Sequence, residues 1–190
     1  LTAMQEGMLF HAELSRGSYF EQFLYPLRGE LDVQLFPRAW ERVVARHAVL
    51  RTAFVRDGLP EPLQAVLRRV ELPFEVVDRR GVPEEERAAE LDAILRADRA
   101  RGFEPARAPL LRVALVRWAD EEWEMAWSFH HVLLDGWSAA RVVGEVAAAY
   151  RALRSGRDAA LPDPRPFRDF VAWARGADAA EAEAVWRREL

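Results

Sequence analysis

The stretch Phe129-His130-His131-Val132-Leu133-Leu134-Asp135-Gly136-Trp137-Ser138 gathers two imidazoles, a carboxylate and a glycine at the end of an apolar run. Along residues 124–131 the odd-numbered side chains fall on one side of an extended segment and the even-numbered ones on the other. Adjacent histidines on a strand therefore point in opposite directions, and only one of them can face a given cleft. Gly136 is expected to make a backbone turn closed to other residues. The stretch predicts a strand, a tight loop and a helix.

The composition is that of one globular unit. The chain has 190 residues, 51% of them hydrophobic, which is enough to bury a sizeable core. Acidic residues outnumber basic ones by 31 to 27, so no overall positive field would attract nucleic acid or an anionic membrane surface. No apolar run approaches the ~20 residues that span a bilayer.

Several kinds of chemistry are excluded by missing residue types. There is no cysteine, which rules out disulfides, thiolate catalysis and thiolate metal sites, and makes a reducing cytoplasm the expected compartment. There is no lysine either, which removes Schiff-base chemistry and the phosphate-binding lysine of nucleotide-binding loops.

Patterning along the chain predicts mixed secondary structure. Thr2-Ala3-Met4-Gln5 fits a capping box that opens a first helix. Two hairpins are expected, and the second of them, which delivers the histidine pair, should be central. The predicted strands are 21–28, 50–55, 62–69, 74–77, 110–118 and 123–130. The further predicted helices begin near 35, at 83 and at 137, and a linker rich in Pro and Asp precedes two short helices at 167–173 and 179–190.

General base chemistry suits the central stretch best. Two consecutive histidines on opposite faces cannot easily ligate one ion, and no Gly-x-Ser-x-Gly elbow exposes a serine nucleophile. A neutral imidazole, with a pKa near ~6.5, can take a proton from an attacking amine or hydroxyl. His131 is the natural candidate because it is the last strand residue before the loop. Asp135 could hold the imidazole or could pair with a buried arginine, and the spacing leaves both roles open.

Three motifs resemble those of the condensation domains of nonribosomal peptide synthetases, in the superfamily related to chloramphenicol acetyltransferase. His130-His131-Val132-Leu133-Leu134-Asp135-Gly136 matches the HHxxxDG signature. Leu1-Thr2-Ala3-Met4-Gln5-Glu6-Gly7-Met8-Leu9-Phe10 is similar to the opening motif, and Arg46-His47-Ala48-Val49-Leu50-Arg51-Thr52-Ala53-Phe54 to the second. HHxxxDG alone would also admit wax ester synthases and other acyltransferases, but three motifs in order are specific.

The resemblance implies roles for individual residues. His131 would act on the acceptor amine or on the tetrahedral intermediate during amide formation, as a base or as a positioner. Asp135 would be structural and would pair with Arg51, while His130 turns into the packing. Gly136 would lie beside the reacting thioester, where a side chain would block a phosphopantetheine arm. No directly bound cofactor and no metal are expected.

The resemblance also implies an α+β sandwich fold, a chloramphenicol acetyltransferase-like lobe in which a mixed β-sheet is flanked by helices. Residues 1–190 would form the amino-terminal lobe of a condensation domain, with residues 155–166 as a linker before the terminal helices and the carboxy-terminal lobe absent. The expected partners are that second lobe and the upstream and downstream peptidyl carrier domains, and the isolated lobe is expected to be inactive. The variants of the first and third motifs look more like the subtype whose donor ends in a D-residue.

Two other functions remain open at this point. One is a free-standing acyltransferase that uses acyl-CoA and completes its cleft across subunits. The other is a non-catalytic module whose histidines are structural and which binds a carrier domain. The donor and acceptor substrates cannot be read from this sequence, because residues of both lobes would select them.

Overall fold

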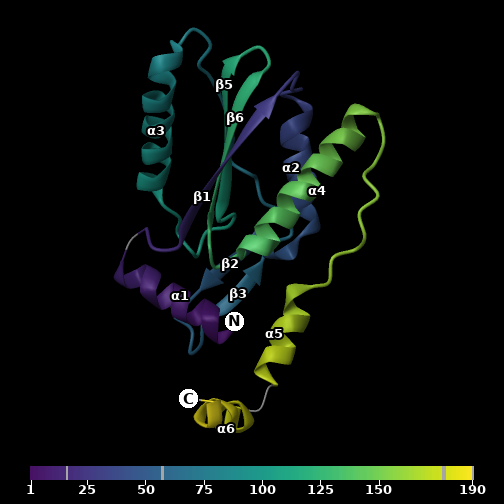
Figure 1. The fold of residues 1–190 in the computed structure, drawn as a ribbon. Helices are drawn as coiled ribbons and strands as arrows, with labels where there is room; N and C mark the ends of the chain where they lie inside the picture. Colours follow the sequence, from purple (N-terminus) through teal and green to yellow (C-terminus); the bar gives the residue numbers. More distant parts are fainter. Residues whose placement is uncertain (16, 57, 177–178, 190) are drawn as a thin grey trace.

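A four-stranded mixed sheet forms the centre of the molecule, which is shown in Figure 1 as a computed structural model that describes residues 1–15, 17–56, 58–176 and 179–189. The strand order is β1-β6-β5-β4, with β1 (Phe20–Arg28), β4 (Phe74–Asp78), β5 (Leu111–Ala119) and β6 (Glu122–His130). The β1/β6 and β6/β5 pairs are antiparallel, and β4 runs parallel to β5. The predicted second hairpin is therefore central, as expected.

Helices cover both faces of this sheet. Helices α2 (Leu35–Arg46) and α4 (Gly136–Arg154) pack together on one face, and α3 (Glu84–Arg101) lies on the other (Figure 1). This is the predicted α+β lobe, with a mixed sheet flanked by helices. The main core lies between the sheet and the α2/α4 pair, where Trp40 of α2 meets Trp127 of β6 with ring centroids 5.1 Å apart.

Helix α3 differs from expectation. Leu91, Ile94 and Leu95, whose helical spacing predicts a buried side for this helix, are only half-buried, and α3 contributes no buried residue to the core. The reason is that polar side chains rather than apolar ones connect its carboxy-terminal end to the sheet. The first turn carries Glu84, Glu85 and Glu86, where carboxylates interact favourably with the helix dipole.

The other elements surround the end of the sheet that carries the histidine pair. Helix α1 (Ala3–Leu14) begins with the predicted capping box, in which Thr2 and Gln5 bond reciprocally. Strands β2 (Thr52–Val55) and β3 (Leu63–Val66) form a separate antiparallel pair. They are shorter than predicted, because residues 48–51 form a turn of 3-10 helix, η1 (Ala48–Arg51), instead of extending the strand.

The carboxy-terminal segment leaves the packed part of the chain. After α4 the chain runs back beside that helix and leads to α5 (Phe167–Arg175) and α6 (Ala179–Glu189) (Figure 1). Large apolar side chains of these two helices are exposed, including Trp173 at 71% and Trp186 at 63%. Leu190, the last residue of the predicted final helix, lies outside the described residues. No helix in the described part of the chain is both long and apolar enough to span a membrane.

Candidate active site

Strand β6 ends at the histidine pair and delivers the two rings into different environments. His130 is 3% exposed, and its Nδ1 atom accepts a hydrogen bond of 3.1 Å from the backbone N–H of Val132. Burial, with a smaller contribution from the charge of the neighbouring His131, lowers the pKa of His130 to about 4. His130 is therefore neutral at pH 7 and bonded within its own loop.

His131 is held by its backbone and remains partly open to solvent. Its N–H donates a hydrogen bond of 2.8 Å to the carbonyl of Tyr19, and its side chain is 32% exposed. Tyr19 has a φ of 61°, in the left-handed region that costs an ordinary residue about 1–2 kcal/mol. The strained backbone of Tyr19 thus places its carbonyl group where it accepts a hydrogen bond from the histidine loop.

Asp135 caps the helix that follows. Its Oδ1 atom accepts a hydrogen bond of 2.7 Å from the N–H of Ser138, which makes it the N-cap of α4. This hydrogen bond holds the pKa of the Asp135 carboxyl below its usual range, and the charge of His131 lowers it further. The carboxylate stabilises the start of α4, directly after the loop that carries His131.

The predicted pair between Asp135 and Arg51 is not formed. The Arg51 guanidinium donates instead to backbone carbonyls, those of Val44 at 3.2 Å, Arg68 at 3.3 Å and Leu67. These bonds join α2 to the chain that follows β3. The prediction failed because the amide groups at the first turn of α4 satisfy the Asp135 carboxylate locally, leaving the arginine to bind carbonyl oxygens of its own neighbourhood.

Gly136 also differs from expectation in its backbone. It is the first residue of α4 and does not take the left-handed turn predicted for it. A Cβ added at this position would meet no heavy atom within 4 Å. Within the described residues, neither backbone conformation nor packing therefore requires glycine here.

Several residues near the histidines were not singled out from the sequence. The Gln5 side chain is 5% exposed and donates a hydrogen bond of 3.3 Å to the carbonyl of Val132, while its oxygen accepts one of 2.9 Å from Gln64. It thereby ties α1 and β3 to the loop that follows His131. Glu145 of α4 accepts from His47 at 2.7 Å and from Arg46 at 3.2 Å. The capping box pointed to Gln5 only as a local cap.

The largest cleft beside the histidines opens on the side of β6 that carries His130, opposite to the side that carries Phe129. Its volume is about 1680 Å³, and its lining includes His130, Leu9 of α1, Phe54 of β2, Phe103 and Arg99. His130 forms part of its wall through a ring that is buried, neutral and already hydrogen-bonded. The more exposed imidazole, that of His131, follows Phe129 on the opposite side.

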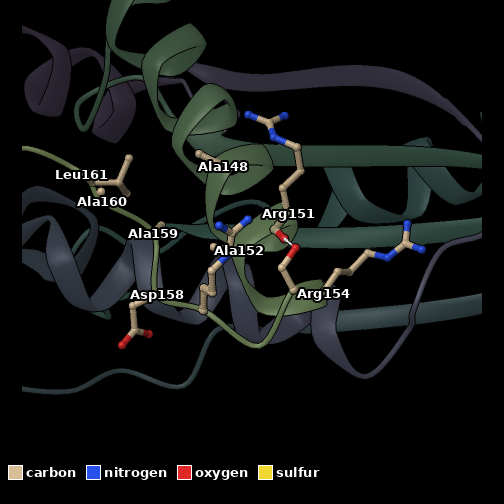
Figure 2. Close-up of a pocket in the computed structure, with 10 residues that line it drawn as sticks. Ala148, Arg151, Ala152, Arg154, Asp158, Ala159, Ala160 and Leu161 are labelled. Carbon is tan, nitrogen blue, oxygen red and sulfur yellow. Dashed lines mark hydrogen bonds between the residues drawn. The ribbon is translucent and has the colours of Figure 1, made fainter.

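A second hollow lies at the far end of α4, against the linker (Figure 2). It has a volume of about 760 Å³, and its charged lining consists of Arg151, Arg154, Arg157 and Asp158. In Figure 2 the side chains of Arg151 and Arg154 extend away from Asp158 and from each other. The guanidinium groups of Arg151 and Arg154 therefore do not converge on a common point in this hollow.

Comparisons with known proteins identify the family. A family model described as "Condensation domain" matches residues 1–190. This chain belongs to the condensation domain family. It is 42% identical over 191 residues to a component of the linear gramicidin synthase of Brevibacillus parabrevis and 36% identical over 192 residues to bacitracin synthase 3 of Bacillus licheniformis. These matches cover all of this chain but only 2% and 3% of those much longer proteins.

Two solved structures share the fold. The starter condensation domain of rhizomide synthetase RzmA superposes with a TM-score of 0.87 at 23% identity, and SgcC5 from Streptomyces globisporus with 0.80 at 25%. All of this chain is covered in both cases, against 47% and 45% of the solved chains. The chain thus corresponds to somewhat less than half of each solved structure and, like them, has a mixed sheet flanked by helices.

Proposed function

We propose that this chain is the amino-terminal lobe of a condensation domain that forms an amide bond in nonribosomal peptide synthesis. The donor is an acyl or peptidyl thioester on one carrier protein, and the acceptor is the amine of an aminoacyl thioester on another. The observation that carries the proposal is the position of His131. Within the family's motif it follows the end of a central strand, with a ring that is one-third exposed beside the amino terminus of α4.

The reaction in which His131 is proposed to act is an acyl transfer from a thioester to an amine. The acceptor amine attacks the carbonyl carbon of the donor thioester, so that an N–C bond forms and the C–S bond breaks. The imidazole either takes the ammonium proton and returns it to the departing thiolate, or accepts a hydrogen bond that aligns the amine. In both roles the products are an amide and the free thiol of the phosphopantetheine arm.

Other residues of the site support this reaction without taking part in proton transfer. His130 and Asp135 fix the loop and the start of α4, and Arg51 braces the neighbouring backbone. Gly136 is assigned to the passage of the thioester, because an added Cβ there would meet no heavy atom within 4 Å and so faces open space. Residues 155–166 serve as the linker before the terminal helices, and a carboxy-terminal lobe would supply the opposite wall of the cleft.

The proposal extends to partners and compartment. Upstream and downstream peptidyl carrier domains would present both substrates on phosphopantetheine, and the protein would work in the cytoplasm. The stretches Gln5–Phe10 and Leu133–Trp137 favour the subtype whose donor ends in a D-residue. A donor peptide that ends in a D-residue should therefore be used faster than its L-epimer by the full-length synthetase.

The deciding experiment measures dipeptide formation by the full-length synthetase with loaded carrier proteins. We expect His131→Ala to lower turnover by about 10²-fold to 10⁴-fold, the usual contribution of an acid–base group. His131→Asn keeps a hydrogen-bond acceptor but takes up no proton, so partial activity would identify a positioning role. The matched control is His11→Ala, which removes an exposed imidazole bonded to Tyr19. Full turnover in His131→Ala would refute the proposal.

Gly136→Ala tests the passage of the thioester separately. The added methyl group meets nothing within this chain, so folding should be unaffected. Turnover with carrier-bound donors should nevertheless fall, while binding of the holo carrier protein, followed by titration, persists. A different result would favour a carrier-binding module instead. In that result, both Gly136→Ala and His131→Ala bind the holo carrier protein, and turnover in both variants equals that of the wild type.

A further inference from the structure

The Nδ1 atom of His131 is buried and has no hydrogen-bond partner. Among the described residues only four buried side-chain nitrogen or oxygen atoms lack one, and the other three are indole nitrogens, those of Trp40, Trp123 and Trp127. A buried polar group without a partner costs about 1–3 kcal/mol. The His131 side chain as a whole is one-third exposed, so its accessible edge lies away from Nδ1.

Glu21 carries the carboxylate that lies near this nitrogen and could accept a hydrogen bond from it. Strand β1 pairs Glu21 with Phe129, and directly opposed residues of an antiparallel pair share a face of the sheet. Glu21 therefore lies on the face that carries Phe129 and, two residues later, His131. The Oε1 atom of Glu21 is 3.8 Å from Nδ1 of His131, about 1 Å beyond a direct hydrogen bond. Catalytic hydrogen bonds are often long in free enzymes and tighten when substrate binds.

Two other acceptors of the histidine loop already bind backbone N–H groups. The Asp135 carboxylate caps α4 through the N–H of Ser138. The carbonyl of Tyr19 accepts the backbone N–H of His131 rather than its ring N–H. By contrast, within the described part of the chain the Glu21 carboxylate has no other ion pair and no hydrogen bond. It is 37% exposed, which leaves it room to move toward the ring.

We propose that Glu21 is a positioning residue that accepts a hydrogen bond from Nδ1–H of His131 and so fixes the tautomer whose Nε2 lone pair faces the reacting groups. This inference rests on the proposed function, because the proposed amide formation is the reaction in which the Nε2 lone pair takes up a proton. Nδ1 keeps its proton throughout. Nε2 takes the proton from the attacking amine and passes it to the thiolate when the C–S bond breaks. Meanwhile the Glu21 carboxylate stabilises the transient imidazolium.

The tautomer can be observed directly. The chain contains only four histidines, so ¹⁵N NMR of the labelled ring nitrogens can assign His131 by its disappearance in His131→Ala. We expect the Nδ1–H form in the wild type and in Glu21→Gln, which keeps an acceptor oxygen. In Glu21→Ala the signals should shift toward the Nε2–H form. The control is Glu75→Ala, which removes an exposed glutamate from β4, the opposite edge of the same sheet. A wild-type Nε2–H form, or an unchanged tautomer in Glu21→Ala, overturns the inference.

Turnover of the full-length synthetase separates this inference from the proposed function. We expect Glu21→Ala to lower kcat by about 10-fold to 100-fold with little change in KM, less than the loss of the whole imidazole. Glu21→Gln should recover part of that loss. If His131→Ala is inactive and Glu21→Ala keeps full kcat, the positioning role is refuted and the proposed function stands. If His131→Ala retains full turnover, the proposed function fails and the catalytic role of Glu21 fails with it.

Discussion

The two faces of the central sheet differ in how fully their polar side chains are hydrogen-bonded. On the α3 face, Asp98 accepts hydrogen bonds from Ser128 at 2.5 Å and Gln22 at 3.0 Å, and it also pairs with Arg112. Arg112 further donates to the carbonyls of Gly102 and Asp98, each at 2.8 Å. On the α4 face, the imidazole of His131 leaves one nitrogen without a partner, and the nearest carboxylate stands 3.8 Å away.

This difference fits a structural role for the Asp98 cluster and the functional role that we propose for His131. Burial alone would raise the pKa of Asp98, but the hydrogen bonds from Ser128 and Arg112 and the charge of Arg112 outweigh it and hold the pKa below its usual range. The Asp98 cluster connects α3 to the sheet, and α3 itself contributes only half-buried apolar side chains and no fully buried one. His131 contributes little that the fold needs, which leaves its ring free to act on a substrate.

The largest effect on stability is expected on the α3 face. Arg112→Ala removes the more buried of the two arginines that pair with Asp98, whose side chain is 13% exposed, and leaves only the exposed Arg101 beside the carboxylate. Breaking a buried pair costs up to about 3–5 kcal/mol, and the remaining pair with Arg101 should keep the loss near the lower end of that range. Urea denaturation of the variant should show that loss in the free energy of unfolding. The double variant Arg112→Ala/Asp98→Ala also removes the half-buried carboxylate that lost its main partner and should be less destabilised. A loss below about 1 kcal/mol in Arg112→Ala would contradict the structural role of the cluster.

The buried histidine should make stability depend on pH. The pKa of His130 is about 4 in the folded chain and ~6.5 when unfolded, so the unfolded state binds more protons between these values. Stability is complete above the unfolded pKa and falls as the pH drops. The expected loss is about 2 kcal/mol between pH 7 and pH 5. His130→Gln should flatten the curve measured by urea denaturation in this window. An equally steep curve in the variant would show that another group is responsible.

A smaller effect is expected where α1 meets the histidine loop. Gln5→Met keeps the size of the side chain but leaves the carbonyl of Val132 and the Gln64 amide without their partner. Stranding such buried groups should lower the free energy of unfolding by about 1–2 kcal/mol. Met8→Leu, a conservative change on the same helix, provides the control for thermal melting. An unchanged melting temperature in Gln5→Met would mean that water replaces the lost amide.

The smallest effect on stability should come from the residue with the largest proposed role in turnover. His131→Ala removes a ring that has no side-chain hydrogen bond within the described residues, so the free energy of unfolding should change by no more than about 0.5 kcal/mol. Urea denaturation of this variant beside Arg112→Ala tests the contrast between the two faces. A loss as large as that of Arg112→Ala would make His131 structural.

Elements with strong local signals could be predicted from the sequence. The capping box of α1, the amphipathic α2 and the central hairpin of β5 and β6 were each located to within a few residues, because their signals lie within one turn or one strand. The predicted strands 50–55 and 62–69 were too long, because η1 and the pairing of β2 with β3 limited them. The pair between Asp135 and Arg51 was wrong, because a helix N-terminus supplied a nearer partner.

The sequence by itself determined the motif, the family resemblance and the opposite orientations of two adjacent histidines, since alternation along a strand is a local property of the backbone. Only the tertiary structure decided what each histidine meets. Strand pairing brings Glu21 next to His131 although 110 positions separate them, and the packing of α3 brings Asp98 under Ser128. Such contacts depend on register and on which face a helix covers, and both are set by the summed packing of the whole chain.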